Sequence, residues 1–197
     1  RQQVNVPNEF NPERNLHFGL RANYMYDEKY VAELNTSMAG SSKLYGSNKW
    51  GFSPGLSLAW ILSEEDFLAS ASAVDFLKAR MSAAQVSYDT DIGYYQYMST
   101  YETQGVYEYG LFSQYENEIW GIYNLGSPDL DYVKRNEWDL GLEGYFFENL
   151  YLEASYFFSK ITGDVVQVDN TYPAYFGGSH AYMNFESSKY AGFDLGF

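Results

Sequence analysis

The segment from residue 89 to residue 133 carries the side chains best suited to binding chemistry. It contains eight Asp or Glu residues, no Lys or Arg, and a dense set of aromatic residues. Carboxylates accept hydrogen bonds from hydroxyl groups, and flat rings stack on the C–H faces of sugars. The sequence therefore predicts ligand contacts from Tyr95, Tyr97, Tyr109 and Trp120, with Trp120 and Tyr95 as the main stacking residues.

The same segment has a purely structural interpretation. Residues 95–103 and 106–115 can form a hairpin outside the main strands, packing on itself or on a partner protein. In that case the aromatic rings supply packing surface, and ligand contact falls to a minority of them.

The residue pattern argues against catalysis. His17 and His180 are single histidines without a second His at metal-ligand spacing, and no G-x-S-x-G nucleophile elbow occurs. The adjacent pair Glu64–Glu65 fits solvated caps on a turn, and Asp89–Asp91 and Asp129–Asp131 lack the EF-hand pattern for Ca²⁺. We expect no catalytic residue, no metal site and no cofactor.

Charge and composition narrow the class further. The net charge is −14, from 26 acidic and 12 basic residues, which disfavours nucleic acid and anionic glycans as partners. The chain has no Cys and no apolar run of the roughly 18–20 residues that a transmembrane helix needs. The start, RQQVNVPNEF, lacks the apolar region of a signal peptide, so we expect a trimmed chain or a piece of a larger one.

The elements that must position these residues are long alternating strands. In residues 135–161, Leu140 and Leu142 share one face with Leu152 and Ala154, whereas acidic residues such as Glu143 and Glu153 take the other face. Seven such strands are expected: 14–26, 30–38, 50–62, 76–88, 135–147, 150–161 and 185–197. Strands of about 12 residues exceed the usual five or six and suit a tilted crossing of a bilayer.

The connections alternate between short and long. Residues 27–29 and 148–149 are tight turns, whereas 39–49, 89–133 and 162–184 are long, and 63–75 is intermediate, with Ser63 as a possible helix N-cap. Antiparallel strands put successive loops on opposite ends, so the long loops share one end. This asymmetry and an odd strand number predict an all-β, antiparallel transmembrane β-barrel segment of about seven long strands, plus a hairpin in a long outer loop.

Residues 40–67, GSSKLYGSNKWGFSPGLSLAWILSEEDF, resemble a barrel pattern of the SusC-like TonB-dependent transporters of Bacteroidetes. The matching positions lie in GSSK, KWGF, Pro54, Trp60, SEE and Phe67, with weaker matches in FLKAR, in SPDL, at Gly141–Leu142 and at Gly192. The resemblance implies that residues 1–197 are part of one 22-stranded barrel domain in the bacterial outer membrane.

The resemblance also implies partners. They are outer-membrane lipid, a SusD-like lipoprotein lid, the TonB complex acting through an N-terminal region absent here, and an oligosaccharide or peptide substrate. Long loops would lie outside the cell and the tight turns in the periplasm.

The alternative is a soluble, aromatic-rich β-domain that binds or hydrolyses carbohydrate. The two hypotheses differ in where the apolar strand face points. In a transporter it contacts lipid, whereas in a soluble domain it lies inside a core.

Overall fold

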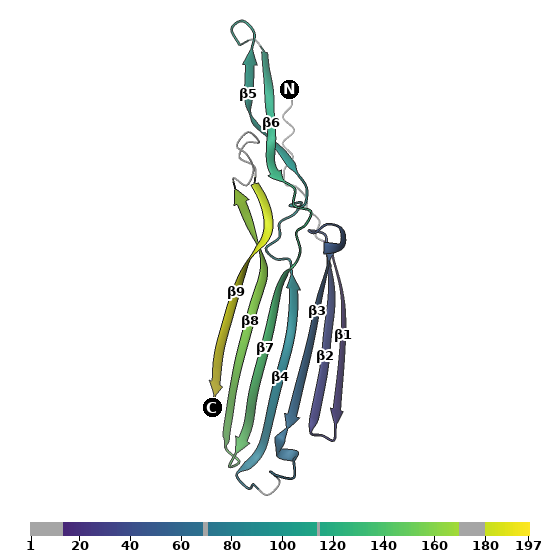
Figure 1. Cartoon of the computed structure of the whole chain (residues 1–197), viewed down its shortest axis with the longest axis vertical. Helices are drawn as coiled ribbons and strands as arrows, with labels where there is room; N and C mark the ends of the chain where they lie inside the picture. The colour runs from purple at the N-terminus through teal and green to yellow at the C-terminus, as the bar shows by residue number, and fades with distance from the viewer. Residues whose placement is uncertain (1–13, 69–70, 114, 170–179) are drawn as a thin grey trace.

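A computed structural model describes residues 14–68, 71–113, 115–169 and 180–197. Its strands form one nine-stranded sheet (Figure 1). The elements are β1 (Asn15–Tyr26), β2 (Tyr30–Ser41), η1 (Gly46–Lys49), β3 (Trp50–Ile61), η2 (Leu62–Glu64), β4 (Val74–Tyr88), β5 (Thr100–Tyr109), β6 (Tyr115–Leu125), β7 (Val133–Phe146), β8 (Leu150–Asp169) and β9 (His180–Gly196), where η marks a short 3₁₀ helix.

The sheet order is β1-β2-β3-β4-β7-β8-β9-β6-β5. Seven long strands pair antiparallel with their neighbours, and β7 pairs with β4 across the excursion that contains β5 and β6. The hairpin β5–β6 extends the sheet beyond one end and joins β9 through a short parallel pairing of Asn124 with His180 and Leu125 with Ala181 (Figure 1). The predicted fold class, seven long strands plus a hairpin in a long loop, is confirmed.

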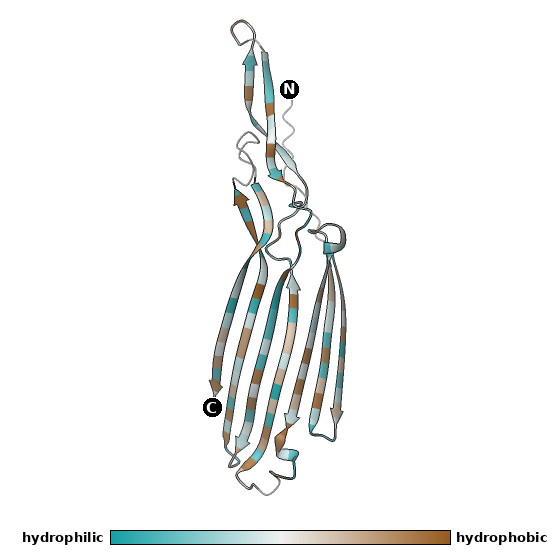
Figure 2. Ribbon diagram, in the orientation of Figure 1, coloured by the Kyte–Doolittle hydropathy of each residue, from teal (hydrophilic) through white to brown (hydrophobic). Residues whose placement is uncertain are grey.

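One face of the seven long strands is apolar along continuous cross-strand rows, and hydropathy alternates along each strand (Figure 2). One row crosses the whole sheet through Tyr24, Ala32, Leu58, Met81, Leu140, Tyr156 and Phe193. The corresponding row on the opposite face is Asn23, Glu33, Ser57, Ser82, Asp139, Phe157 and Gly192. The register therefore separates the sheet into an apolar and a mainly polar face.

The apolar band shifts along the strands across the sheet. On β1 the apolar face runs from Leu16 to Tyr26, whereas on β7 it runs from Trp138 to Phe146, and Leu142 is level with Tyr26. The band centre thus moves by about five residues, or about 17 Å, over four strand spacings of about 19 Å in total. Most of the shift falls between β3 and β4. Tilted strands produce such a shift, because a band of constant height crosses successive strands at different residues.

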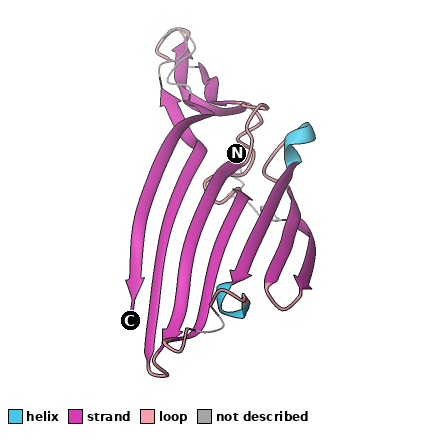
Figure 3. Cartoon of the chain, turned by 60° about the horizontal axis from the view of Figure 1, so that its bottom comes forward, coloured by secondary structure: helices cyan, strands magenta, loops and turns pink. Residues whose placement is uncertain are grey.

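The two ends of the sheet differ in the way strands are joined. At one end, three residues separate the paired residues Tyr26 and Tyr30, and three separate Phe146 and Leu150. The first two residues of each connection, Asp27–Glu28 and Phe147–Glu148, take positive φ angles of 53–60°, as in the type I′ turns that match the twist of the flanking strands. η2 lies at the same end, which is called the turn end below (Figure 3). The opposite end, where the excursion leaves the sheet, is called the loop end. Ser63 is not a helix cap, because Ile61 occupies that position and no side chain caps η2.

The structure corrects the predicted bounds of two loops. The excursion hairpin is formed by 100–109 and 115–125, later in the chain than 95–103 and 106–115. The loop expected at 162–184 is shorter, because β8 continues to Asp169 and β9 begins at His180; residues 170–179 lie outside the described residues. A bulge at Gly163, with φ +79, lets the long β8–β9 pair bend and continue.

The buried apolar core is small and lies at the loop end of the sheet. Leu44, Ile92, Leu130 and Tyr132 form it, with exposures of 0–3%. By contrast, the large apolar side chains in the middle of the long strands are exposed, for example Leu140 at 55% and Phe18 at 59%. The strands therefore do not enclose a hydrophobic core among the described residues.

Candidate functional site

Tyr132 anchors the loop end of the sheet. Its hydroxyl donates to the carbonyl oxygens of Ala39 at 3.1 Å and Lys49 at 3.0 Å, so it joins the returning excursion to β2 and to the start of β3. Burial, followed by the charge of Asp89, raises the pKa of this hydroxyl, which keeps it protonated as a donor. Tyr132 thus fixes the point at which the chain returns to the sheet as β7.

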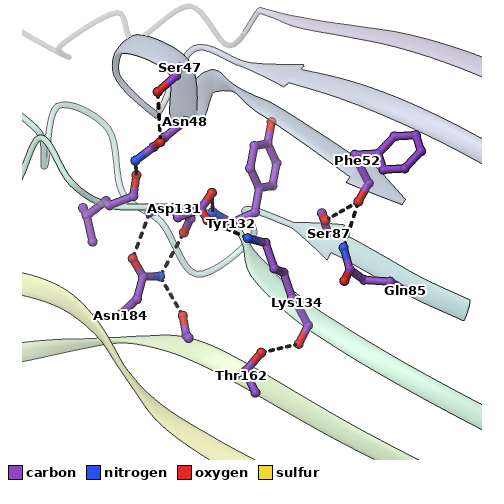
Figure 4. Close-up of polar contacts among 12 residues, drawn as sticks. Ser47, Asn48, Phe52, Gln85, Ser87, Asp131, Tyr132, Lys134, Thr162 and Asn184 are labelled. Carbon is purple, nitrogen blue, oxygen red and sulfur yellow. Dashed lines mark hydrogen bonds and ion pairs between the residues drawn. The ribbon is translucent and has the colours of Figure 1, made fainter. Parts of the chain in front are cut away.

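Asn184 makes a second anchor, from β9 (Figure 4). Its Nδ2 donates to the carbonyl oxygens of Asp131 at 2.9 Å and Gly163 at 2.7 Å, and its Oδ1 accepts from the Asp131 amide at 2.8 Å. Asn48 adds a bond from its Nδ2 to the Leu130 carbonyl at 3.1 Å. The returning end of the excursion is therefore hydrogen-bonded to η1 and β9, and β9 in turn to β8. These contacts, with those of Tyr132, are called the base of the excursion below.

The residues of the GSSK and KWG motifs meet in this base. A Cβ at Gly40 would lie 2.8 Å from the Trp50 ring, and one at Gly51 would lie 3.0 Å from the Tyr132 ring. Both glycines therefore let a ring lie directly against the backbone. Ser41 Oγ donates to the Asp89 carboxylate, and Lys43 Nζ donates to the Asp89 carbonyl at 3.2 Å.

Glu65 has a structural role at the turn end. It accepts hydrogen bonds from the Tyr30 hydroxyl at 2.7 Å and Trp60 Nε1 at 3.0 Å, and lies 3.6 Å from Lys29 Nζ. The hydrogen bond from Tyr30, then that from Trp60, lowers the pKa of the Glu65 carboxyl. The interpretation of Glu65 as a solvated cap was wrong, since its side chain is only 17% exposed.

The polar face of the sheet carries paired charges. Arg80 contacts Asp139 at 2.7 Å and Glu153 at 3.2 Å, and Lys78 pairs with Glu143. The side chains of Asp139 and Glu143 are each 20% exposed, far less than the leucines of the opposite face. Glu143 and Glu153 therefore share the polar face, as the alternation predicted.

An aromatic hollow lies where the excursion meets β9. It has a volume of about 630 Å³ and is walled by three parts of the chain: residues 93–96, 98 and 100–101, residues 123–124 of β6, and His180 with Tyr182 of β9. Its rings include Tyr94, Tyr95, Tyr101, Tyr123 and Tyr182, and its polar groups include Gln96 and Asn124. No Lys or Arg is among the described residues that line it.

His180 is held at the rim of this hollow by Asp169. Its Nδ1 lies 2.7 Å from Asp169 Oδ1, and the Tyr123 ring meets the imidazole edge-on, with centroids 5.4 Å apart. Hydrogen bonds from Gln167, then from His180, lower the pKa of the Asp169 carboxyl. The amide Nε2 of Gln167, a hydrogen-bond donor, lies 2.9 Å from the same Nδ1, so Asp169 and Gln167 together fix the position of the imidazole ring.

The four predicted site residues do not form one cluster. Tyr95 lines the hollow, whereas Tyr97 stacks on Tyr45 with centroids 5.6 Å apart. Tyr109 stacks with Tyr115 at 5.4 Å near the hairpin tip, and Trp120 lies on β6 opposite Thr103, 61% exposed.

The sequence prediction missed Tyr123, His180 and Tyr182 as lining residues of the hollow. Tyr101, also missed, lay inside the acidic, aromatic segment but was not singled out there. The parallel pairing of β6 with β9, the edge-on contact of Tyr123 with His180 and a hydrogen bond from the Tyr182 amide to Ser127 Oγ at 3.2 Å bring the two distant segments together.

A further hollow, about 740 Å³, lies on the apolar face, lined almost entirely by carbon. Rings such as Tyr24, Tyr26 and Trp60 rise around smaller residues such as Ala32 and Ala79. Because it is open and offers almost no hydrogen-bonding group, we interpret it as relief on an apolar outer surface and not as a ligand site.

The described residues contain no group of three or more His, Cys, Asp or Glu side chains able to hold a metal ion. Nor does any described helix have the length and apolar character needed to cross a membrane.

Exposed apolar rows, paired charges on the opposite face and loops of unequal length at the two ends define a segment of a β-barrel of the outer-membrane type. Solved structures share this fold. The RagAB peptide importer in its open-open state superposes with a TM-score of 0.75 at 21% identity, over 93% of this chain and 19% of that one. At this identity the likeness establishes the fold alone.

Sequence comparisons give the same class. The chain is 28% identical over 183 residues to TonB-dependent receptor P26 of Formosa agariphila, covering 89% of this chain and 17% of the relative. It is 27% identical over 130 residues to TonB-dependent receptor SusC of Bacteroides thetaiotaomicron, covering 64% and 12%. No family model matches.

The resemblance seen in the sequence is confirmed: in sequence and in fold, the chain is similar to a barrel segment of SusC-like TonB-dependent transporters. It spans less than a fifth of the length of the curated relatives it matches.

Proposed function

We propose that this chain forms part of the wall of an outer-membrane transporter that imports a large nutrient, either an oligosaccharide or a peptide. In this proposal the apolar face contacts lipid, and the polar face lines the lumen of a 22-stranded barrel. The loop end, with the β5–β6 hairpin, faces outward and contributes to the vestibule. A SusD-like lipoprotein covers that vestibule, and TonB supplies the energy through another part of the transporter.

One observation carries this proposal: the exposure of the two sheet faces is the reverse of that in a soluble domain. Leu140 and Leu142 are 55% and 46% exposed on the apolar face. On the opposite face, the carboxylates of Glu33 and Asp139 are 19% and 20% exposed and paired with arginines. Water disfavours an apolar surface that spans seven strands, whereas a bilayer accepts it. The relatives are named TonB-dependent receptors, which supports the same function.

The vestibule part of the proposal can be tested with a shortened hairpin. Because Thr103 and Trp120 are opposite each other in the β5–β6 ladder, an Asn-Gly turn between them should close a shorter hairpin after residues 104–119 are removed. In the complete transporter, we expect this variant to insert normally but to lose lid retention or growth on the imported nutrient. The matched control keeps all residues of the hairpin and adds a Gly-Ser pair at its natural tip.

Wild-type growth and lid retention in the shortened variant would show that the hairpin has no part in uptake. Import itself is tested by removing the transporter gene and, separately, by collapsing the proton-motive force. If uptake of the nutrient survives both treatments, the transporter proposal is wrong.

A further inference from the structure

We propose that the aromatic hollow is a binding site for a neutral saccharide. Its lining, as defined above, consists of residues 93–96, 98, 100–101 and 123–124 with His180 and Tyr182. This inference rests on the proposed function, because it names the class of nutrient that the vestibule holds. It goes beyond that function by assigning the contact to particular residues and by choosing sugar over peptide.

The shape and lining of the hollow suit a sugar. Its volume of about 630 Å³ lies within the range of small-molecule sites, roughly 300–1,000 Å³. Tyr95 and Tyr101 are 43% and 61% exposed, so their rings remain available for stacking on sugar C–H faces. The rings come from separate segments that meet at the β6–β9 pairing, which gives the hollow a built wall instead of a single aromatic stripe.

The polar groups of the hollow are suited to hydroxyl groups. Asn124 is 7% exposed; its Nδ2 donates to the Met98 carbonyl at 3.0 Å, and its Oδ1 is buried with no hydrogen-bond partner. Asn124 is therefore a fixed part of the wall, and its Oδ1 lies below the accessible surface of the hollow. Gln96 and the His180 imidazole are lining groups that exchange hydrogen bonds with neutral partners.

Charge distinguishes a neutral ligand from an anionic one. No Lys or Arg is among the described residues that line the hollow, so a peptide carboxylate, a uronate or a sulfate would have no counter-charge there. The nearby Lys43 lies 5.5 Å above the Tyr94 ring and donates to the Asp89 carbonyl. Acidic residues of the excursion would also repel anions within a Debye length of about 8 Å.

The test measures binding to the complete transporter in detergent by calorimetry. The probes are maltohexaose, cellohexaose, mannohexaose and xylohexaose, compared with hexagalacturonate and a tryptic peptide mixture. We expect at least one neutral hexasaccharide to bind the wild type, and Tyr95→Ala and Tyr101→Ala each to weaken that binding roughly twofold to twelvefold. Tyr107→Ala and Tyr115→Ala are matched controls on the same excursion, outside the lining, and should leave the affinity unchanged.

Three outcomes would overturn the inference: no neutral hexasaccharide binds, binding is unchanged in Tyr95→Ala and Tyr101→Ala, or the two variants lose peptide or hexagalacturonate binding instead. Correct insertion of each variant is measured on the intact cells from which it is purified, by labelling a cysteine introduced at the loop end. A transporter that inserts and imports but fails these binding tests refutes the sugar site alone. One that fails to insert even as the wild type refutes the proposed function.

Discussion

Replacing Leu142 with Arg tests the membrane-facing assignment at its most sensitive point. Leu142 is the middle residue of the apolar face of β7, which extends from Trp138 to Phe146, and it is 46% exposed. A cation at the midplane of a barrel costs about 2–4 kcal/mol, falling to about 0–1 kcal/mol near the interface. We therefore expect Leu142→Arg to destabilise the inserted transporter by about 2–4 kcal/mol, and Phe146→Arg by about 0–1 kcal/mol.

The measurement is the urea concentration at half-unfolding from lipid vesicles, followed by tryptophan fluorescence. Phe146→Arg is the internal control, because it introduces the same charge on the same strand face at the edge of the apolar band. Equal destabilisation by the two variants, or a tolerated arginine at Leu142, would refute the assignment of this face to lipid. A comparable cost from both, with loss of folding in the absence of lipid too, would point to a protein core.

Three other predictions follow from the geometry. A cysteine at Gly110 should react with an impermeant reagent on intact cells and one at Asn149 should not; the reverse pattern would invert the orientation. Because the hydrogen bond from Tyr30 lowers the pKa of Glu65, the stabilisation from Glu65 is complete above the ordinary glutamate pKa of about 4.3 and is lost as pH falls below it. Glu65→Gln should therefore lower the melting temperature at pH 7 and reduce the loss on acidification, and an unchanged pH profile would count against this contact. Tyr132→Phe should cost about 1–3 kcal/mol, because two carbonyl oxygens lose their donor, and normal hydrogen-exchange protection at the start of β7 would contradict that role.

The long strands were predictable because their alternation is uninterrupted. In β7 and β8 the side chains change face at every residue from Trp138 to Phe146 and from Leu150 to Phe158. A slip of one residue would reverse every side chain, so the pattern fixes the register as well as the strand.

The excursion hairpin was misplaced for an identifiable physical reason. A bulge near Gly105, with φ +154, shifts the β5–β6 register between Thr103 and Gly105 and breaks the alternation there. The hairpin turn contains Gly110, Phe112 and Ser113, all at positive φ. Gly105 and Gly110 both offered a turn signal, and the predicted hairpin closed at the earlier glycine.

The candidate site was only partly predictable, because it depends on long-range pairing. Tyr95 follows from the aromatic, acidic composition of its own segment. His180 and Tyr182 are more than 50 residues away along the chain and reach the hollow through long-range contacts such as the pairing of β6 with β9. Local composition carries no information about that contact.

The central claim, that neighbouring residues of one strand face lipid and lumen, is tested most directly by fluorescence quenching. Leu58 lies in the apolar row, and the adjacent Ser57 lies in the polar row. Single cysteines at these positions in the complete transporter, each labelled with bimane, are measured in vesicles that contain brominated lipid. The account predicts strong quenching at position 58 and little at position 57; equal quenching at both, or stronger quenching at 57, would contradict it.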